Sequence, residues 1–212
     1  MLKIKSFEFS PIQENTYLLY NEFLDCIIID PGCYFDEEKE QLADYITEMK
    51  LKPVMLLNTH CHLDHVFGNK FVAEKYNLKL QMHKKEKSTF DFAAASGLMY
   101  NMPFDNYQGE IIYFEEGGEI VLGEDKLKVL FTPGHSPGSV SFYNEKDGFV
   151  ISGDALFYGS IGRTDLPGGN HDLLIKNIRE NLMVLPESTK VYSGHGRVTS
   201  IGRERIENPF LQ

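Results

Sequence analysis

Residues 59–65 read Thr-His-Cys-His-Leu-Asp-His, which places three imidazoles and one carboxylate within seven consecutive positions. Histidine nitrogen suits zinc, iron, copper and nickel, whereas carboxylate oxygen suits harder ions. The pattern is a poor match to a structural zinc site, because such sites are usually rich in cysteine thiolate and closed by four protein ligands. The single thiol in the stretch, Cys61, is interpreted as a bystander. The stretch therefore indicates a hydrolytic or oxygen-handling centre, with enough donors to begin two metal sites.

Apolar β-branched runs alternate with helical patterns along the chain and are closed by glycine-bearing turns. This alternation is typical of an α/β layer protein. Strands are predicted at residues 2–9, 16–20, 26–29, 54–58, 79–82, 126–131, 139–143, 149–152 and 190–192. Helices are predicted at residues 36–50, at about 66–76 and at 171–185.

Three later donors, His135, Asp154 and His195, each follow a glycine just past the C-terminal end of a predicted strand. In open α/β sheets ligands bind at that edge, because the loops leaving it converge on one crevice. The preceding glycine allows the backbone to turn sharply. Any one of the three alone reads as an ordinary loop residue. Since the placement occurs three times beside a dense cluster, we expect all three to meet the residues of the 59–65 stretch.

Asp30 closes the predicted strand 26–29 at the same edge of the sheet. Two interpretations stay open: it orients a metal-bound histidine, as carboxylates behind a ligand do, or it caps the following Pro-Gly turn. His83 precedes a lysine-rich run and His171 opens a predicted helix. Both are predicted to lie at the surface or behind a ligand.

The 59–65 stretch resembles the HxHxDH signature of the metallo-β-lactamase superfamily, and the later histidine, aspartate and histidine follow in that family's order. The resemblance implies an αββα sandwich, in which two mixed sheets pack face to face with helices outside. It also implies which residues hold metal. His60, His62 and His135 would hold one ion, Asp64, His65 and His195 would hold a second, and Asp154 would bridge the two.

The chain also resembles the short, glyoxalase II-like branch of that superfamily, in the segment 153–165, with Gly-Arg-Thr-Asp at 162–165, and in the terminal Asn-Pro-Phe-Leu-Gln. This resemblance implies hydrolysis of hydroxyacylglutathione. Related persulfide dioxygenases share the Gly-Arg-Thr-Asp element. Only 17 residues follow His195. We therefore expect one domain over residues 1–212, without the C-terminal helical domain that supplies much of the glutathione pocket in glyoxalase II.

The expected cofactor is a pair of divalent ions, with zinc first and iron or manganese as alternatives. Two ions roughly 3.5 to 4 Å apart share a hydroxide, because coordination brings the pKa of water from about 15.7 towards about 7. We therefore expect hydrolysis of a thioester, such as an S-acylglutathione or a related small acyl-thiol. Asp64 and Asp154 are the expected catalytic carboxylates, with Asp154 holding the bridge.

Substrate contacts are predicted for Arg163, Phe157 and Tyr158, and Asp30, Thr59 and Asp165 are predicted to support the ligands. A carboxylate on the substrate would suit bidentate binding by Arg163, although an internal ion pair with Asp165 is the favoured interpretation of that arginine. Residues 84–110 form a long connection, and connections of this length are usually functional or carry their own helix. The segment is either a lid or apolar wall over the active site, or an extra helix packed on the core.

Rival functions keep the fold and change the chemistry. His60, His135 and Asp154 alone would make the two-histidine, one-carboxylate face of non-haem iron oxygenases, as expected for a persulfide dioxygenase. A lactonase or β-lactamase is also open, because metal-activated water does not choose among acyl substrates. A non-catalytic metal-binding protein is the alternative from outside the enzymes.

Composition limits the partners. The chain has 212 residues, 42% of them hydrophobic, and a formal charge of −10, which argues against nucleic acid because its binders carry basic patches. Its three cysteines include no CxxC pair, so a disulfide framework is not expected. No apolar run is long enough to span a bilayer, and the first residues lack the apolar core of a leader. We expect a cytoplasmic protein with no membrane partner, and the sequence does not indicate its oligomeric state.

Overall fold

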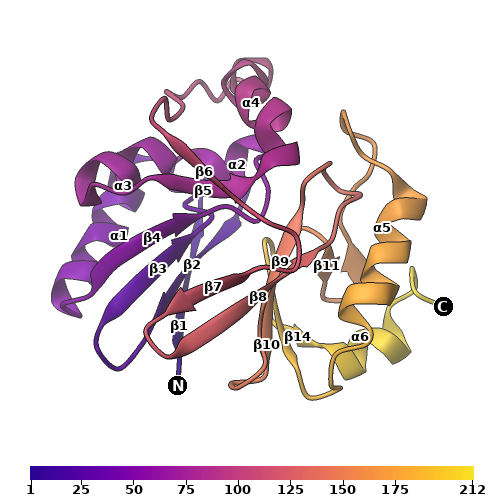
Figure 1. Cartoon of the computed structure of the whole chain (residues 1–212). Coiled ribbons are helices and arrows are strands. Elements are labelled where there is room, and N and C mark those ends of the chain that lie inside the picture. Colours follow the sequence, from indigo (N-terminus) through magenta and orange to yellow (C-terminus); the bar gives the residue numbers. More distant parts are fainter.

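The computed structural model describes residues 1–212, arranged as two mixed β-sheets packed face to face with helices on both outer sides (Figure 1). The first sheet has the strand order β1-β2-β3-β4-β5-β6, with bounds Lys3–Phe9, Glu14–Tyr20, Asp25–Ile29, Lys52–Leu57, Leu80–His83 and Ile111–Phe114. The second has the order β14-β13-β10-β9-β8-β7, with bounds Thr199–Ser200, Lys190–Ser193, Phe149–Gly153, Val140–Asn144, Asp125–Phe131 and Glu119–Leu122. A small hairpin pairs β11 (Leu156–Phe157) with β12 (Ser160–Ile161).

Alternation along the strands divides the core into three layers. In β3, Ile27 and Ile29 join the cluster between the sheets, whereas Cys26 and Ile28 join the cluster beneath the helices of the first sheet, as the two-residue period of a strand requires. Helices α1 (Asp36–Glu48), α3 (Asn69–Tyr76) and α4 (Lys87–Met99) cover that face. Helices α5 (His171–Asn177) and α6 (Ile201–Glu207) cover the outer face of the second sheet. The predicted αββα fold is confirmed.

All nine predicted strands are present, with bounds that differ by at most two residues. The strands that the sequence did not predict, β6, β7, β11, β12 and β14, are short. In β6, Ile112 and Tyr113 are exposed, and β7 follows a run of glutamates and glycines. These segments lie at sheet edges or outside the two main sheets, so their side chains carry a weaker pattern of burial.

Two predicted helices are interrupted. The expected helix at 66–76 is in fact α2 (Leu63–Val66) followed by α3, with a break at Gly68. There the Gly68 N–H donates to the Pro31 carbonyl over 2.7 Å, and a Cβ would lie 2.3 Å from Cys33 Sγ. The expected helix at 171–185 ends its α-helical part at Asn177 and continues as a π-helical turn, Ile178–Leu182. Helix α6 was not predicted.

Residues 84–110 begin with a 3-10 turn, η1 (Lys84–Glu86), and continue into α4. Phe90 and Ala93 of α4 are buried in the core above the first sheet. At its end Leu98 and Met99 are 69% and 75% exposed. The segment therefore combines a packed helix with an exposed apolar end. No helix in the structure is both long and apolar enough to cross a bilayer.

Candidate metal centre

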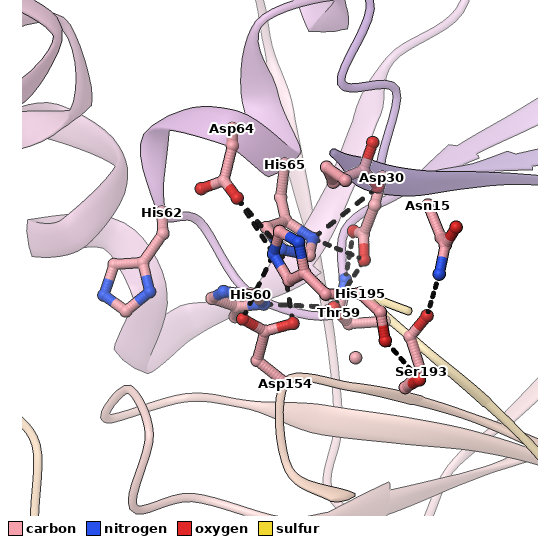
Figure 2. Close-up of polar contacts among 12 residues, drawn as sticks. Asn15, Asp30, Thr59, His60, His62, Asp64, His65, Asp154, Ser193 and His195 are labelled. Atoms are coloured by element: carbon pink, nitrogen blue, oxygen red, sulfur yellow. Dashed lines mark hydrogen bonds and ion pairs between the residues drawn. The ribbon is translucent and has the colours of Figure 1, made fainter. Parts of the chain in front are cut away.

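The seven residues predicted to hold metal lie at one edge of the sandwich, where loops leave both sheets. Figure 2 shows all of them except His135. The 59–65 stretch follows β4, and His135, Asp154 and His195 follow β8, β10 and β13. Strands β3 and β4 are parallel, as are β10 and β13, so their carboxyl ends deliver these loops to the same place. All seven side chains therefore come within reach of one another.

A first group consists of three histidines. The Nε2 atom of His135 lies 2.8 Å from His62 Nδ1 and 3.2 Å from His60 Nε2. Burial lowers the pKa of all three, and that of His62 to about 3. The three rings are therefore neutral, and a nitrogen of each faces one point. Neutral imidazole is the form that binds metal.

A second group consists of Asp64, His65 and His195. Asp64 Oδ2 lies 3.1 Å from His195 Nε2 and 3.7 Å from His65 Nε2. Burial lowers the pKa of His65, but the carboxylates of Asp154 and Asp64 outweigh it and raise the pKa well above its usual range. For Asp64 burial acts in the opposite direction and raises the pKa, but the neighbouring His65 and His195 outweigh it and bring the pKa below its ordinary value. The Asp64 carboxylate is therefore ionised, which is the form that binds a metal ion.

Asp154 stands between the two groups. Its Oδ1 lies 3.4 Å from His65 Nε2, and its Oδ2 lies 3.5 Å from His135 Nε2 and 3.6 Å from His195 Nε2. Burial raises the pKa of Asp154, but His65 outweighs it and holds the pKa well below its usual range. This carboxylate is therefore charged and reaches members of both groups.

Oxygen acceptors fix which ring nitrogen of each histidine faces the centre. The Nδ1 of His195 donates to the Gln13 carbonyl over 3.1 Å, and the Nδ1 of His135 donates to the Arg163 carbonyl over 2.8 Å. A carbonyl can only accept, so the proton is on Nδ1 and the lone pair is on Nε2. These bonds aim Nε2 at the centre, which is how ligating histidines are usually held.

Asp30 fixes two more of these rings. Its Oδ2 accepts from His65 Nδ1 over 3.1 Å and from the Thr59 hydroxyl over 2.5 Å, and that hydroxyl lies 3.2 Å from His60 Nδ1. Its Oδ1 accepts from the Thr59 and Asn58 nitrogens. Asp30, His60 and His65 also lie close enough to form a metal group of their own. We discount that grouping because both Asp30 oxygens already accept two hydrogen bonds.

The donor set fits divalent metal. Buried side-chain atoms are nearly always hydrogen-bonded, yet His65 Nε2 and Asp154 Oδ1 make no hydrogen bond and lie 3.4 Å from each other. Both point at the centre, where an ion would satisfy them. Nitrogen from five histidines and oxygen from two aspartates suit zinc, iron or manganese.

Glycines make room for this crowding. Gly153 adopts a φ of +50°, a left-handed conformation that favours glycine and confirms the expected sharp turn before Asp154. Gly194 has no such conformation; instead, a Cβ there would lie 2.1 Å from Asp154 Oδ1. Close approach, not turn geometry, explains glycine before His195.

Of the three residues predicted to contact the substrate, Phe157 borders the centre, whereas the side chains of Arg163 and Tyr158 interact with other residues. Arg163 makes a bidentate ion pair with Asp165 over 2.7 and 2.8 Å, and its backbone carbonyl rather than its side chain reaches His135. The Phe157 ring lies 6.2 Å from that of His195, so it borders the centre. The Tyr158 ring is covered by the guanidinium groups of Arg197 and Arg203, at 3.4 and 3.5 Å.

Three remaining predictions concern residues outside the centre. His171 is exposed at the start of α5, as expected. His83 is not at the surface: as the last residue of β5 it is buried against Phe131 of the second sheet, with ring centroids 4.8 Å apart. The Cys61 thiol lies 3.4 Å from Met82 Sδ in the core, and burial raises its pKa well above the ordinary value. None of the three cysteines is paired.

Three polar residues near the centre were not predicted. Glu14 is fully buried, with Oε1 3.9 Å from His65 Nδ1. The Asn15 amide donates to the carbonyls of Ser193 and Gly196, on either side of His195. Glu86 is also fully buried and hydrogen-bonds two of the metal-ligand loops. A polar Glu-Asn pair directly before an apolar strand was the available signal for the first two.

Sequence comparison gives two informative relatives. The family model of the metallo-beta-lactamase superfamily matches residues 10–195. The chain is 41% identical to the "probable metallo-hydrolase YqgX" of Bacillus subtilis over 99% of this chain and 98% of the relative. It is 32% identical to "hydroxyacylglutathione hydrolase GloC" of Haemophilus influenzae, over the same shares of both chains.

Solved structures show the same architecture. The BLEG-1 B3 metallo-beta-lactamase superposes with a TM-score of 0.90 at 37% identity, covering 99% of this chain and all of the other. TTHA1623 "in a di-iron-bound form" gives 0.88 at 34% identity, covering 98% and 100%. ETHE1 from Myxococcus xanthus gives 0.79 at 26% identity, covering 98% of this chain and 83% of its own.

Proposed function

Because the chain belongs to the metallo-β-lactamase superfamily, we propose that it is a metal-dependent hydrolase that cleaves a thioester, using two divalent ions held by the two groups described above. The proposed substrate is a small acyl-thiol, such as an S-acylglutathione, and the proposed location is the cytoplasm. The name of the GloC relative supports this substrate class. The di-iron-bound form of TTHA1623 supports a two-metal centre.

One observation carries the proposal: Asp154 lies between two complete ligand groups, within 3.6 Å of nitrogen atoms in both. A single-metal enzyme needs only one group. Here the histidines of the second group are also oriented by hydrogen bonds: the Gln13 carbonyl fixes the ring of His195, and Asp30 fixes that of His65.

When bound, two divalent ions supply a water of lowered pKa as nucleophile and polarise the carbonyl of the ester. The residues of the chain hold and orient. His60, His62 and His135 would hold one ion and Asp64, His65 and His195 the other, and Asp154 would keep the two in register. The Phe157 ring beside His195 would exclude water from one side of the scissile bond. A thiolate is a good leaving group, so no side chain is required to protonate it.

The loop that carries His195 also offers a cation for an acidic thiol portion of the substrate. Arg163 and Arg203 are already ion-paired with neighbouring acids, whereas Arg197, two residues beyond His195, makes no ion pair. A guanidinium recognises a carboxylate through paired hydrogen bonds. Arg197 is therefore the residue that we propose to contact the substrate carboxylate, with Tyr158 holding its side chain in place.

A persulfide dioxygenase is the second candidate, because the ETHE1 fold also superposes on the chain. His60, His135 and Asp154 could form the face of a single iron site. The separate group of Asp64, His65 and His195 has no function in that mechanism, which is why we favour the hydrolase.

Product analysis distinguishes the two candidates. Protein loaded with zinc or iron is given a glutathione thioester in one assay and glutathione persulfide in another, while free thiol and dissolved oxygen are followed. We expect one free thiol for each thioester consumed and no oxygen uptake with either substrate. Oxygen consumption on the persulfide, without thiol release from the thioester, would overturn the proposal in favour of the dioxygenase.

A further inference from the structure

Glu86, at the end of η1, has a carboxylate that joins two metal-ligand loops from opposite sheets. Its Oε2 accepts from the backbone N–H of Cys61 over 2.8 Å, and Cys61 lies between His60 and His62. Its Oε1 accepts from the Ser136 hydroxyl over 2.7 Å and from the Gly138 N–H over 2.6 Å. Ser136 directly follows His135. The carboxylate thus connects the loops of all three histidines in the first group.

The surroundings of Glu86 leave it no other function. The side chain is fully buried, and no lysine or arginine pairs with it. All three of its neighbours are donors, so an ionised carboxylate satisfies them and each oxygen has a partner. A buried carboxylate without a cationic partner is costly, and here three hydrogen bonds, all from the loops that carry the histidines, offset that cost.

We propose that Glu86 is a positioning residue that sets the spacing between His135 and the pair His60 and His62, and so determines metal affinity at the three-histidine group. The inference rests on the proposed metal-dependent function. It also gives residues 84–110 a function in the centre, because η1 supplies the clamp that holds the loops together. The group of Asp64, His65 and His195 depends on Asp30 and Gln13 instead, so Glu86 should affect one ion and not the other.

Glu86→Gln tests the clamp with the least change in shape. An amide has one acceptor oxygen, so whichever way it is turned its nitrogen faces a backbone N–H, that of Cys61 or that of Gly138. In chelator competition we expect the affinity for one of the two metal ions to fall by roughly 10–100-fold. The second equivalent should keep its affinity. Replacing zinc by cobalt should change the absorption spectrum of the weakened site only.

Glu204→Gln is the matched control. Glu204 is another fully buried carboxylate with several donors, including Thr199 and Asn208, but it lies in α6. We expect it to lower the melting temperature of the metal-free protein and leave both metal affinities unchanged. If Glu86→Gln behaves in the same way, with both affinities within twofold of the wild type, the positioning function is excluded.

Ser136→Ala covers the case in which Glu86→Gln does not fold. It removes one hydrogen bond and keeps the carboxylate, and we expect a several-fold loss of affinity for the same single equivalent. An unchanged affinity in that variant would overturn the proposal. The metal titrations need no substrate. If Glu86→Gln loses affinity for one ion and the wild type releases no thiol, the hydrolase is refuted and the positioning function of Glu86 stands.

Discussion

Asp154→Ala should abolish thioester hydrolysis while leaving the protein folded. Asp154 is the one carboxylate within 3.6 Å of histidine nitrogens in both groups, so its removal separates the two metal positions. We expect turnover to fall by roughly 10³-fold or more, which corresponds to about 4 kcal/mol of barrier. The measurement is the rate of thiol release at saturating substrate, with metal content determined on the same sample.

Stability separates this effect from misfolding. Asp154 faces His65 at 3.4 Å, and that histidine holds the pKa of the carboxyl well below its usual range, so the charged carboxylate stabilises the fold at neutral pH. The variant without metal should therefore melt at a lower temperature than the wild type without metal, but still in one cooperative transition. Asp172→Ala, at an exposed carboxylate in the first turn of α5, is the control and should keep full activity. Near-normal turnover in Asp154→Ala would show that the centre does not operate as a pair.

Asp30→Asn should weaken both metal positions together, although Asp30 holds neither ion. If the new amide nitrogen replaces Oδ2, it donates to His65 Nδ1 and forces the ring proton onto Nε2, the atom that would bind metal. If it replaces Oδ1, it faces the N–H of Thr59 and the amide of Asn58. We expect affinity to fall by roughly 10–100-fold and stability by about 1–3 kcal/mol.

Chelator competition and thermal unfolding measure these two quantities. Asp125→Asn is the matched control, since Asp125 is also buried and pairs with Lys146 but begins β8, at the end of the strand opposite His135. It should lower stability without altering metal binding. An Asp30→Asn protein that binds both ions normally would mean that the hydrogen bonds to His65 and Thr59 are incidental to the centre.

The metal ligands could be predicted from the sequence because each of them follows the carboxyl end of a recognisable strand. Residues that follow parallel strands reach one edge of a sheet, and the glycine-bearing turns after β8, β10 and β13 could be recognised from the apolar runs before them. Glu14 and Asn15 escaped this reasoning because β2 is antiparallel to β3. Its beginning, not its end, lies at the ligand edge.

Other parts of the centre depend on tertiary structure. Glu86 sits in the run Lys84 to Lys87, which reads as a solvated surface, and only the packing of η1 against both loops buries it. The ring orientations of His135 and His195 depend on backbone carbonyls, which carry no side-chain signature. The same applies to Gly194, whose function is visible only beside Asp154.

We claim that thioester hydrolysis requires two bound metal ions, and a zinc titration measures that requirement. Metal-free protein is titrated with zinc while thiol release from a glutathione thioester is recorded after each addition. We expect activity to increase until about two equivalents have bound and then to remain constant. Full activity at one equivalent, or binding of two equivalents without any release of thiol, would contradict the claim.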